Sequence, residues 1–148
     1  MTTSIQHIKA QKRLAALLYP HYTIIRVEME LPASNPKYVY DGEEFIIKPY
    51  KLDAYGYFPK PNCNCTHRQI GIEVDGKKGH KTSKHQYYRD EMRTEILKSQ
   101  YEGIYIHRFD TKDLVGRGYV NPKTKKRHSI LTDEEILKEL GIKCTHQA

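Results

Sequence analysis

A strand–helix–strand pattern in the second half of the chain constrains the fold more than any other feature. Residues 69–74 are short, apolar and bounded by Gly76, which is typical of a central strand. Residues 83–100 have the apolar stripe of a helix, and residues 104–109 again form an apolar strand pattern. Such a unit joins two parallel strands through a right-handed crossover. We therefore predict an α/β fold in which a mixed central β-sheet is flanked by α-helices.

The first half of the chain predicts one helix followed by antiparallel strands. Residues 5–18 have helical periodicity, whereas residues 23–31 and 51–58 have strand patterns. Asp41-Gly42 is a hairpin turn signal, with residues 44–48 as the returning strand. A run of strands with no helix between them favours antiparallel pairing.

The end of the chain predicts a short helix, a basic segment and a capped helix. Residues 110–114 start the short helix, and residues 116–128 are basic and rich in turn residues. Residues 132–140 have a helical pattern with Thr132 as N-cap and Glu135 completing a capping box.

Length and charge limit the classes of protein to be considered. A chain of 148 residues suits one domain, residues 1–148, and we place its core at about residues 23–114. The net charge of +7 favours a polyanionic partner, most often nucleic acid, although a solvated basic surface without a specific partner is the alternative. No apolar stretch approaches the ~20 residues of a membrane span, and we expect no signal peptide. The expected protein is soluble and cytoplasmic.

Three carboxylates occur in or beside the predicted strands. Asp53 lies within one strand, and Glu73 and Asp75 close the next, with side chains on the same side of it. Oxygen donors that converge at a strand end suit Mg²⁺ or Mn²⁺. The structural alternative is that the Val-Asp-Gly sequence is a strand entering a turn and that Glu73 pairs with Arg93 or Arg108.

A metal site of this kind is suited to phosphodiester hydrolysis. The metal ion polarises the phosphoryl group, activates the attacking water and stabilises the leaving oxygen. Lys77, Lys78, His80 and Lys81 follow the carboxylates directly, and a lysine there can hold the water or neutralise charge on the phosphate. Together with the basic composition, the pattern predicts a metal-dependent endonuclease acting on DNA.

The order of these residues is shared with a known group of nucleases. The matching fragments are Leu52-Asp53, Ile72-Glu73-Val74-Asp75-Gly76 with His80, Arg89-Asp90 with Arg93, and Gly103 to Arg108-Phe109. They resemble the PD-(D/E)xK nuclease superfamily, and most closely its small members similar to the very-short-patch mismatch repair endonuclease. The resemblance covers roughly residues 51–113, and its order and spacing are more specific than any single fragment.

The resemblance implies a restriction-endonuclease-like fold and a set of metal ligands. It makes Asp53 and Glu73 ligands, with the carbonyl of Val74 as a further oxygen donor. Many relatives also carry an acidic residue on the first helix. This chain has none there, and Gln6 and Gln11 are the nearest substitutes.

The resemblance also indicates where the catalytic lysine is missing. Asp75 stands where many members of the superfamily carry that lysine, and we expect it to assist metal binding. His80 matches a histidine of the closer subgroup, which implies a role as general acid or base or as a phosphate ligand. The task of the lysine then falls to Lys77, His80 or Lys84.

Basic residues around the predicted site are candidates for contacts with nucleic acid. We expect phosphate contacts from Lys78, Lys81, Lys84, Arg89 and Arg93. The alternative for the two arginines is an ordinary helix with internal charge pairs. The basic residues 116–128 either follow a DNA backbone or form a solvated loop. We interpret the strand tyrosines, Tyr55 and Tyr57 among them, as core and edge-strand residues rather than as a stacking platform.

Cysteine and histidine residues suggest a second, structural metal site. Cys63, Cys65 and His67 lie in a predicted loop at residues 59–67, and Cys144 lies near the end of the chain. Together they could bind Zn²⁺ tetrahedrally, although their spacing is not that of a usual zinc finger. The alternative is an exposed loop with free thiols.

Three classes of function follow from these patterns. The first is a Mg²⁺- or Mn²⁺-dependent DNA endonuclease, with a structure-selective enzyme such as a Holliday-junction resolvase as its close variant. A homodimer is plausible because small nucleases often pair to cut two strands. The second is a nuclease-like module that binds nucleic acid without catalysis, and the third is a basic structural protein without a nucleic-acid partner.

Overall fold

The computed structural model describes residues 5–30, 37–46, 51–75, 84–115, 123 and 129–144. In chain order the elements are α1 (Ile5–Leu18), β1 (Tyr22–Glu30), β2 (Lys37–Tyr40), β3 (Glu43–Ile46), β4 (Lys51–Pro59), β5 (Cys63–Cys65), β6 (Gln69–Asp75), α2 (Lys84–Gln100), β7 (Ile104–Asp110), α3 (Thr111–Leu114), α4 (Asp133–Glu139) and β8 (Ile142–Cys144). Each helix and strand predicted from the sequence is confirmed, and its boundaries shift by at most two residues.

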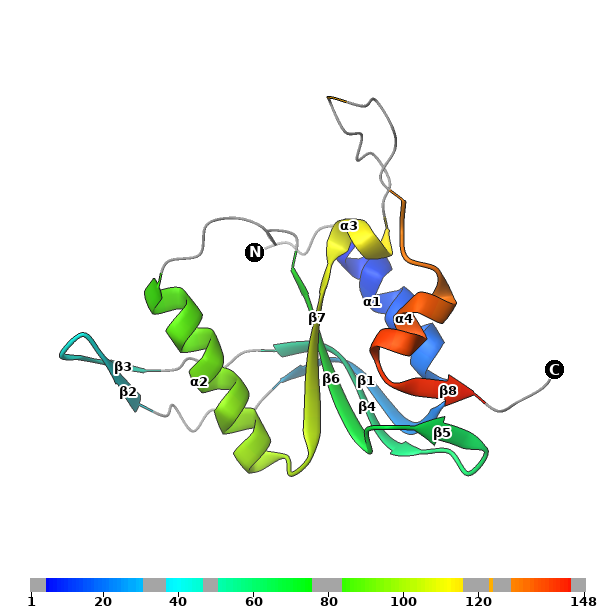
Figure 1. The fold of residues 1–148 in the computed structure, drawn as a ribbon, viewed down its shortest axis with the longest axis horizontal. Helices are drawn as coiled ribbons and strands as arrows, with labels where there is room; N and C mark the ends of the chain where they lie inside the picture. Colours follow the sequence, from blue (N-terminus) through cyan, green and yellow to red (C-terminus); the bar gives the residue numbers. More distant parts are fainter. Residues whose placement is uncertain are drawn as a thin grey trace.

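Four strands form the central sheet, in the order β1-β4-β6-β7. The first two pairs are antiparallel, and β6 pairs with β7 in parallel. α2 connects the parallel strands, as the strand–helix–strand pattern predicted (Figure 1). The predicted mixed α/β sheet with helices on both sides is therefore confirmed. No helix within the described part of the chain is long and apolar enough to cross a membrane.

The β2–β3 hairpin lies beyond α2, away from the central sheet (Figure 1). Its turn is the predicted Asp41-Gly42 pair, and both residues have positive φ angles, of 51° and 79°. The hairpin contacts the start of α2 through aromatic side chains. The Tyr38 hydroxyl lies 2.7 Å from His85 Nε2, and the Tyr40 ring stacks on the His85 ring with 4.6 Å between centroids.

The β5–β8 pair differs from the sequence prediction. Residues 59–67 were predicted to be a loop, but Cys63–Cys65 within them pair antiparallel with Ile142–Cys144. Both strands have three residues, and their partners lie about 80 positions apart in the chain. A periodicity read within one segment contains no information on such a remote pairing.

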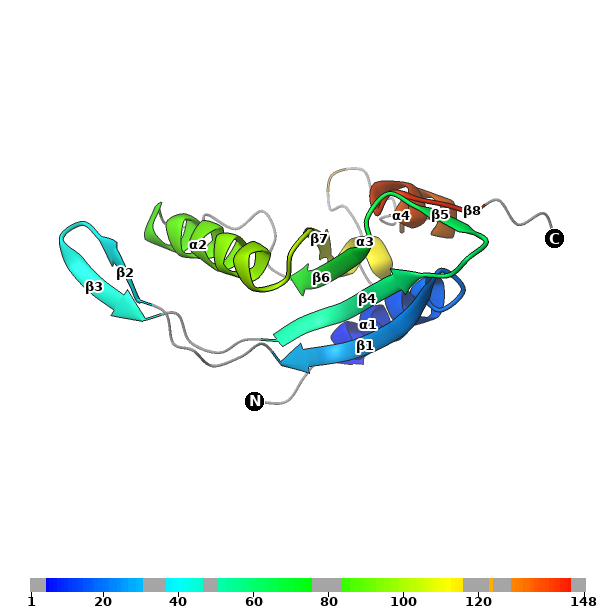
Figure 2. The ribbon, with the colours of Figure 1, turned by 90° about the horizontal axis from the view of Figure 1, so that it is seen from below.

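The face of the sheet covered by α1 holds the larger part of the apolar core. Figure 2 shows α1 lying along β1 and β4 on the face away from α2. Ala10, Leu14 and Leu18 repeat every four residues along α1 and are fully buried. They pack in one cluster with Ala54, Ile70, Ile72, Val74, Phe109, Ile136 and Leu140. The core therefore extends beyond residues 23–114, because α1 and α4 both contribute to it.

The opposite face, covered by α2, is smaller and more polar. Its buried cluster consists of Leu52, Tyr55, Leu97 and Ile104. Alternate residues of β6 point to this face, so Gln69 and Glu73 lie at the two ends of the same strand surface. This face therefore has fewer buried apolar residues than the α1 face, and Gln69 and Glu73 give it polar side chains at both ends of β6.

Candidate active site

A pocket of about 270 Å³ lies beside the C-terminal end of β6 and the first half of α2. It is lined by Lys51, Asp53, Glu73, Val74, Gln86, Arg89, Asp90, Arg93 and Arg108. These residues come from β4, β6, β7 and α2. Two of the three carboxylates that the sequence placed together, Asp53 and Glu73, therefore line one pocket.

Asp53 is held in a fixed orientation by three groups. The Val74 N–H donates to Oδ2 at 2.6 Å, His7 Nε2 lies 2.6 Å from Oδ1, and Gln11 Nε2 donates to Oδ1 at 3.3 Å. His7 and Gln11 are four residues apart and share a face of α1. The helix thus reaches Asp53 through a histidine and an amide, and Gln11 is one of the two residues that the sequence offered in place of the missing acid. The Asp53 side chain keeps 15% of its surface exposed.

Glu73 belongs to a chain of ion pairs on the α2 face. Arg108 Nε donates to Glu73 Oε2 at 2.7 Å, and Arg108 Nη1 lies 3.6 Å from Asp90 Oδ2. Arg93 Nη1 approaches the other oxygen of Asp90 at 3.8 Å. The pairing of Glu73 with Arg108 that the sequence offered as a structural alternative is thus confirmed. Because Arg108 is 43% exposed, solvent weakens this pair.

Cations outnumber carboxylates in the lining of the pocket. Lys51 and three arginines face three carboxylates, which leaves one net positive charge. Arg89 has a buried Nε–H that meets no acceptor among the described residues. The net positive charge of the lining favours an anion in the pocket.

Several predicted site residues lie outside the part of the chain that the structure describes. They are the side chain of Asp75 and the whole of Lys77, Lys78, His80 and Lys81. Of residues 116–128, only Lys123 is described. Lys84 is described and is exposed at the first position of α2. Their predicted roles stay predictions.

The described side chains do not form a complete metal cage. No three His, Cys, Asp or Glu side chains among them lie close enough together to hold a metal ion. The pocket instead brings together two carboxylates, Asp53 and Glu73, and the peptide group of Val74. Oxygen donors of this type are those that Mg²⁺ takes, and in this structure Asp53 bonds to His7, Gln11 and the Val74 N–H while Glu73 pairs with Arg108.

Three of the four predicted zinc residues, Cys63, Cys65 and Cys144, lie on the paired strands β5 and β8. Cys63 Sγ lies 3.2 Å from Nδ1 of the buried His21, and the backbone register places Cys63 opposite Cys144. The side chain of Cys144 lies outside the described residues. His67 stacks on a tyrosine ring of β7 with 4.0 Å between centroids, and burial lowers the pKa of His67. Cys65 is half-buried, and its Sγ donates to the His21 carbonyl at 3.9 Å.

Two residues of the site were missed by the sequence interpretation. His7 contacts Asp53, and its signal was its position four residues before Gln11 on the same helix face. Lys51 lines the pocket, and its signal was its position two residues before Asp53 in a strand. Neither position indicates a site until the packing of α1 and the sheet strands around the pocket is known.

Comparisons of this chain with protein-family models, with curated proteins and with solved structures found no match. The functional argument therefore depends on the geometry of the pocket and on the order of its residues in the sequence. Both concern the same two carboxylates, Asp53 and Glu73.

Proposed function

We propose that this chain is a metal-dependent endonuclease that hydrolyses DNA and has a restriction-endonuclease-like fold. The observation that carries the proposal is the pocket in which Asp53 and Glu73 lie beside three arginines and a lysine. Carboxylates beside clustered cations suit a metal ion and a phosphate together. The mixed sheet with α1 on one face and α2 on the other agrees with the fold that the resemblance implies.

In this proposal Mg²⁺ or Mn²⁺ binds Asp53 and Glu73, with the carbonyl of Val74 and the side chain of Asp75 as further oxygen donors. The ion supplies Lewis-acid activation of water and of the phosphoryl group. His7 and the Val74 N–H keep the Asp53 carboxylate in one orientation, so it needs little reorganisation before it binds a cation.

The arginines of the pocket are suited to the phosphate backbone of the substrate. Guanidinium groups bind phosphate through two parallel hydrogen bonds. Arg89 and Arg108 both line the pocket, and the 43% exposed Arg108 side chain pairs with Glu73 and Asp90. We assign the attacking water to Lys77, His80 or Lys84, as the sequence predicts.

The test is cleavage of supercoiled plasmid, linear duplex, four-way junction and single-stranded DNA with Mg²⁺ or Mn²⁺. We expect Asp53→Asn and Glu73→Gln to reduce the cleavage rate by at least about 100-fold, because each removes a charged metal ligand. Isothermal titration with Mn²⁺ should show weaker binding to both variants. Preference for the junction would identify the structure-selective variant of the proposal.

Two exposed acids of the β2–β3 hairpin provide matched controls. Asp41→Asn and Glu43→Gln make the same chemical changes outside the pocket, and Asn is compatible with the positive φ of position 41. Both should cleave like the parent protein. Full activity of Asp53→Asn and Glu73→Gln would refute the proposal.

A second candidate function is a nucleic-acid-binding module without catalysis. It is favoured by the partners that both candidate ligands already have, His7 for Asp53 and Arg108 for Glu73. Such a module would bind DNA in a salt-dependent manner but would not bind Mn²⁺ in the calorimeter. The same titration therefore separates the two functions.

A further inference from the structure

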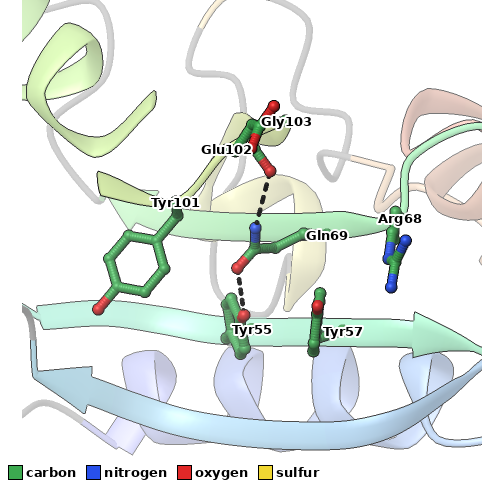
Figure 3. A pocket seen from close by; sticks show the side chains of 7 residues that line it. All are labelled: Tyr55, Tyr57, Arg68, Gln69, Tyr101, Glu102 and Gly103. Atoms are coloured by element: carbon green, nitrogen blue, oxygen red, sulfur yellow. Dashed lines mark hydrogen bonds between the residues drawn. The ribbon is translucent and has the colours of Figure 1, made fainter. Parts of the chain in front are cut away.

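A second pocket, of about 710 Å³, lies at the opposite end of α2 and β6 from the candidate active site. It is lined by Tyr55, Tyr57, Arg68, Gln69, Tyr101, Glu102 and Gly103. Figure 3 shows Tyr55 and Tyr57 side by side on β4, with Gln69 of β6 bonded to Tyr55. Tyr101 lies on one side of the pair and Arg68 on the other. The pocket therefore combines aromatic rings with an amide and a guanidinium group.

Tyr55 and Tyr57 form a slot with the dimensions of a planar ring. Their ring centroids are 6.5 Å apart, and the ring planes differ by 23°. Bases stack about 3.4 Å apart, so one base between two rings requires roughly 6.8 Å. A small adjustment of Tyr57, which is only half-buried, is enough to admit one.

Gln69 provides polar groups at the inner end of this slot. It is 6% exposed, and its Oε1 accepts a hydrogen bond from the Tyr55 hydroxyl. One N–H of its amide donates to the Glu102 carbonyl at 3.4 Å, which is a long bond. An amide carries two N–H donors, so Gln69 has a further donor for the edge of a base.

Arg68 lines the pocket, and Phe58 lies next to it in contact with Arg68 and Tyr57. The exposed Arg68 guanidinium lies 5.8 Å from the Tyr57 ring centroid and 4.9 Å from that of Phe58. Phe58 is 44% exposed and has a φ of 64°, which is unfavourable for a bulky residue. The chain thus keeps an exposed aromatic ring and a cation together beside the pocket.

We propose that this pocket binds one unpaired nucleotide of a nucleic-acid strand. The base stacks between Tyr55 and Tyr57, its edge meets Gln69, and its phosphate contacts Arg68. The choice of a strand rather than a free nucleotide rests on the proposed function. Enzymes that act on nucleic acids commonly hold a base out of the stack in this way.

The position of the two pockets supports the assignment. Gln69 and Glu73 belong to the same surface of β6 and are four residues apart, which is about 13 Å along a strand. That distance equals roughly four base steps of 3.4 Å. One nucleic-acid strand can therefore reach both pockets, with the unpaired nucleotide a few positions from the scissile phosphate.

The test uses a single-stranded oligonucleotide that contains 2-aminopurine, whose fluorescence falls when it stacks on an aromatic ring. The titration is done with EDTA, so that neither cleavage nor metal binding is needed. The chain has no tryptophan, which keeps the background low. We expect Tyr57→Ala and Arg68→Ala to bind about 10-fold more weakly, because a stacked base or a phosphate contact is lost. Tyr57→Phe should bind and quench like the parent protein.

Tyr19→Ala is the matched control. Tyr19 is 69% exposed and has Lys60 4.7 Å above its ring, so it is also a tyrosine beside a cation. Its removal should leave affinity and quenching unchanged. Equal affinities for the parent, Tyr57→Ala and Arg68→Ala would overturn the proposal, as would binding of free dAMP without binding of the oligonucleotide.

The result is independent of the proposed nuclease activity. Asp53→Asn should keep the Tyr57-dependent quenching, because the assay contains no metal ion. If the parent protein cleaves no DNA but shows this quenching, the nuclease proposal fails and the nucleotide site stands. If it cleaves DNA while Tyr57→Ala binds normally, the nucleotide site fails and the nuclease stands.

Discussion

The two faces of the central sheet differ in how completely they are filled. On the α1 face, three helices cover an apolar cluster that includes the fully buried Leu14, Ile72 and Ile136. On the α2 face, a smaller cluster around Leu97 separates two pockets at the ends of the helix. The same strands supply both faces, because successive residues point in opposite directions. The α1 face is thus the more completely packed of the two, while the α2 face keeps two pockets with polar linings.

The largest expected difference between the faces concerns two buried leucines. Leu14→Ala should lower the free energy of unfolding by about 4 kcal/mol, since helices and sheet enclose the cavity on all sides. Leu97→Ala should lower it by only about 2.5 kcal/mol, because the less completely filled α2 face can relax into the space. Urea denaturation of both variants measures these values. An equal or larger loss for Leu97→Ala would show that the α2 face is packed as tightly as the other.

Replacing two strand glycines by alanine tests the same comparison by adding a methyl group to each face instead of removing side-chain atoms. A Cβ at Gly56 would lie 3.0 Å from the Tyr22 ring, which cannot withdraw because its hydroxyl donates to the His67 carbonyl at 2.6 Å. A Cβ at Gly71 would lie 2.8 Å from a terminal methyl of Leu52 and 2.9 Å from that of Ile106, and both are flexible ends that can turn away. We expect losses of about 2 kcal/mol for Gly56→Ala and about 1 kcal/mol for Gly71→Ala.

The measurement is again the midpoint of urea denaturation. The added methyl group at Gly71 has the shorter contact but is predicted to cost less stability than the one at Gly56. The result therefore shows whether the rigidity of the neighbouring side chain or its distance determines the cost. If Gly71→Ala is the more damaging variant, the side chains of the α2 face are held as firmly as the Tyr22 ring.

The elements of both faces that the sequence predicted are those with a local pattern. The spacing of Ala10, Leu14 and Leu18 identified α1, and the apolar run that ends at Asp75 identified β6, because both patterns are local. The position of Asp53 in one strand and Glu73 in the next was enough to predict a shared site, since β4 and β6 are adjacent.

What the sequence could not reveal depends on the packing of remote segments. His7 reaches Asp53 only because α1 lies against β4, 46 positions along the chain. The β5–β8 pair and the contact of His21 with Cys63 depend on remote partners in the same way. The resemblance supplied the order of the acidic and basic residues but not the pairing of Arg108 with both Glu73 and Asp90. The replacement for the catalytic lysine stays a prediction.

Two arginines should show opposite effects on stability and on binding. Arg13, on the α1 side, donates to the carbonyls of Leu114 and Leu131 and pairs with Asp133. Arg13→Ala should therefore lower the free energy of unfolding by about 2 kcal/mol without changing DNA affinity. Arg108→Ala should change stability by less than about 1 kcal/mol, because its ion pairs are exposed.

DNA binding provides the second half of this comparison. If Arg108 contacts a phosphate, Arg108→Ala should weaken binding several-fold at low salt and reduce the slope of log affinity against log salt by about 1. Fluorescence anisotropy with a labelled duplex at several salt concentrations measures both quantities. A loss of DNA affinity in Arg13→Ala but not in Arg108→Ala would reverse the roles assigned to the two faces.

The smallest expected effect is a pH dependence of stability on the α1 side. Burial lowers the pKa of His67, whose ring stacks on Tyr105. Its neutral form is therefore favoured in the folded state, while in the unfolded chain it titrates near 6.5. Stability from this residue is fully present above about pH 6.5 and is lost as the pH falls below that value toward the lower pKa of the folded state.

His67→Phe retains a ring against Tyr105 but cannot bind a proton. Between pH 7 and pH 5 this variant should lose less stability than the parent protein, whereas above pH 7 the two should change in parallel. Urea denaturation at half-unit pH intervals measures the difference. Parallel curves over the whole range would mean that His67 is as well solvated in the folded protein as in the unfolded chain. The region around β5 would then be more open than the rest of the α1 side, and the contrast between the faces would be confined to the cluster around Leu14.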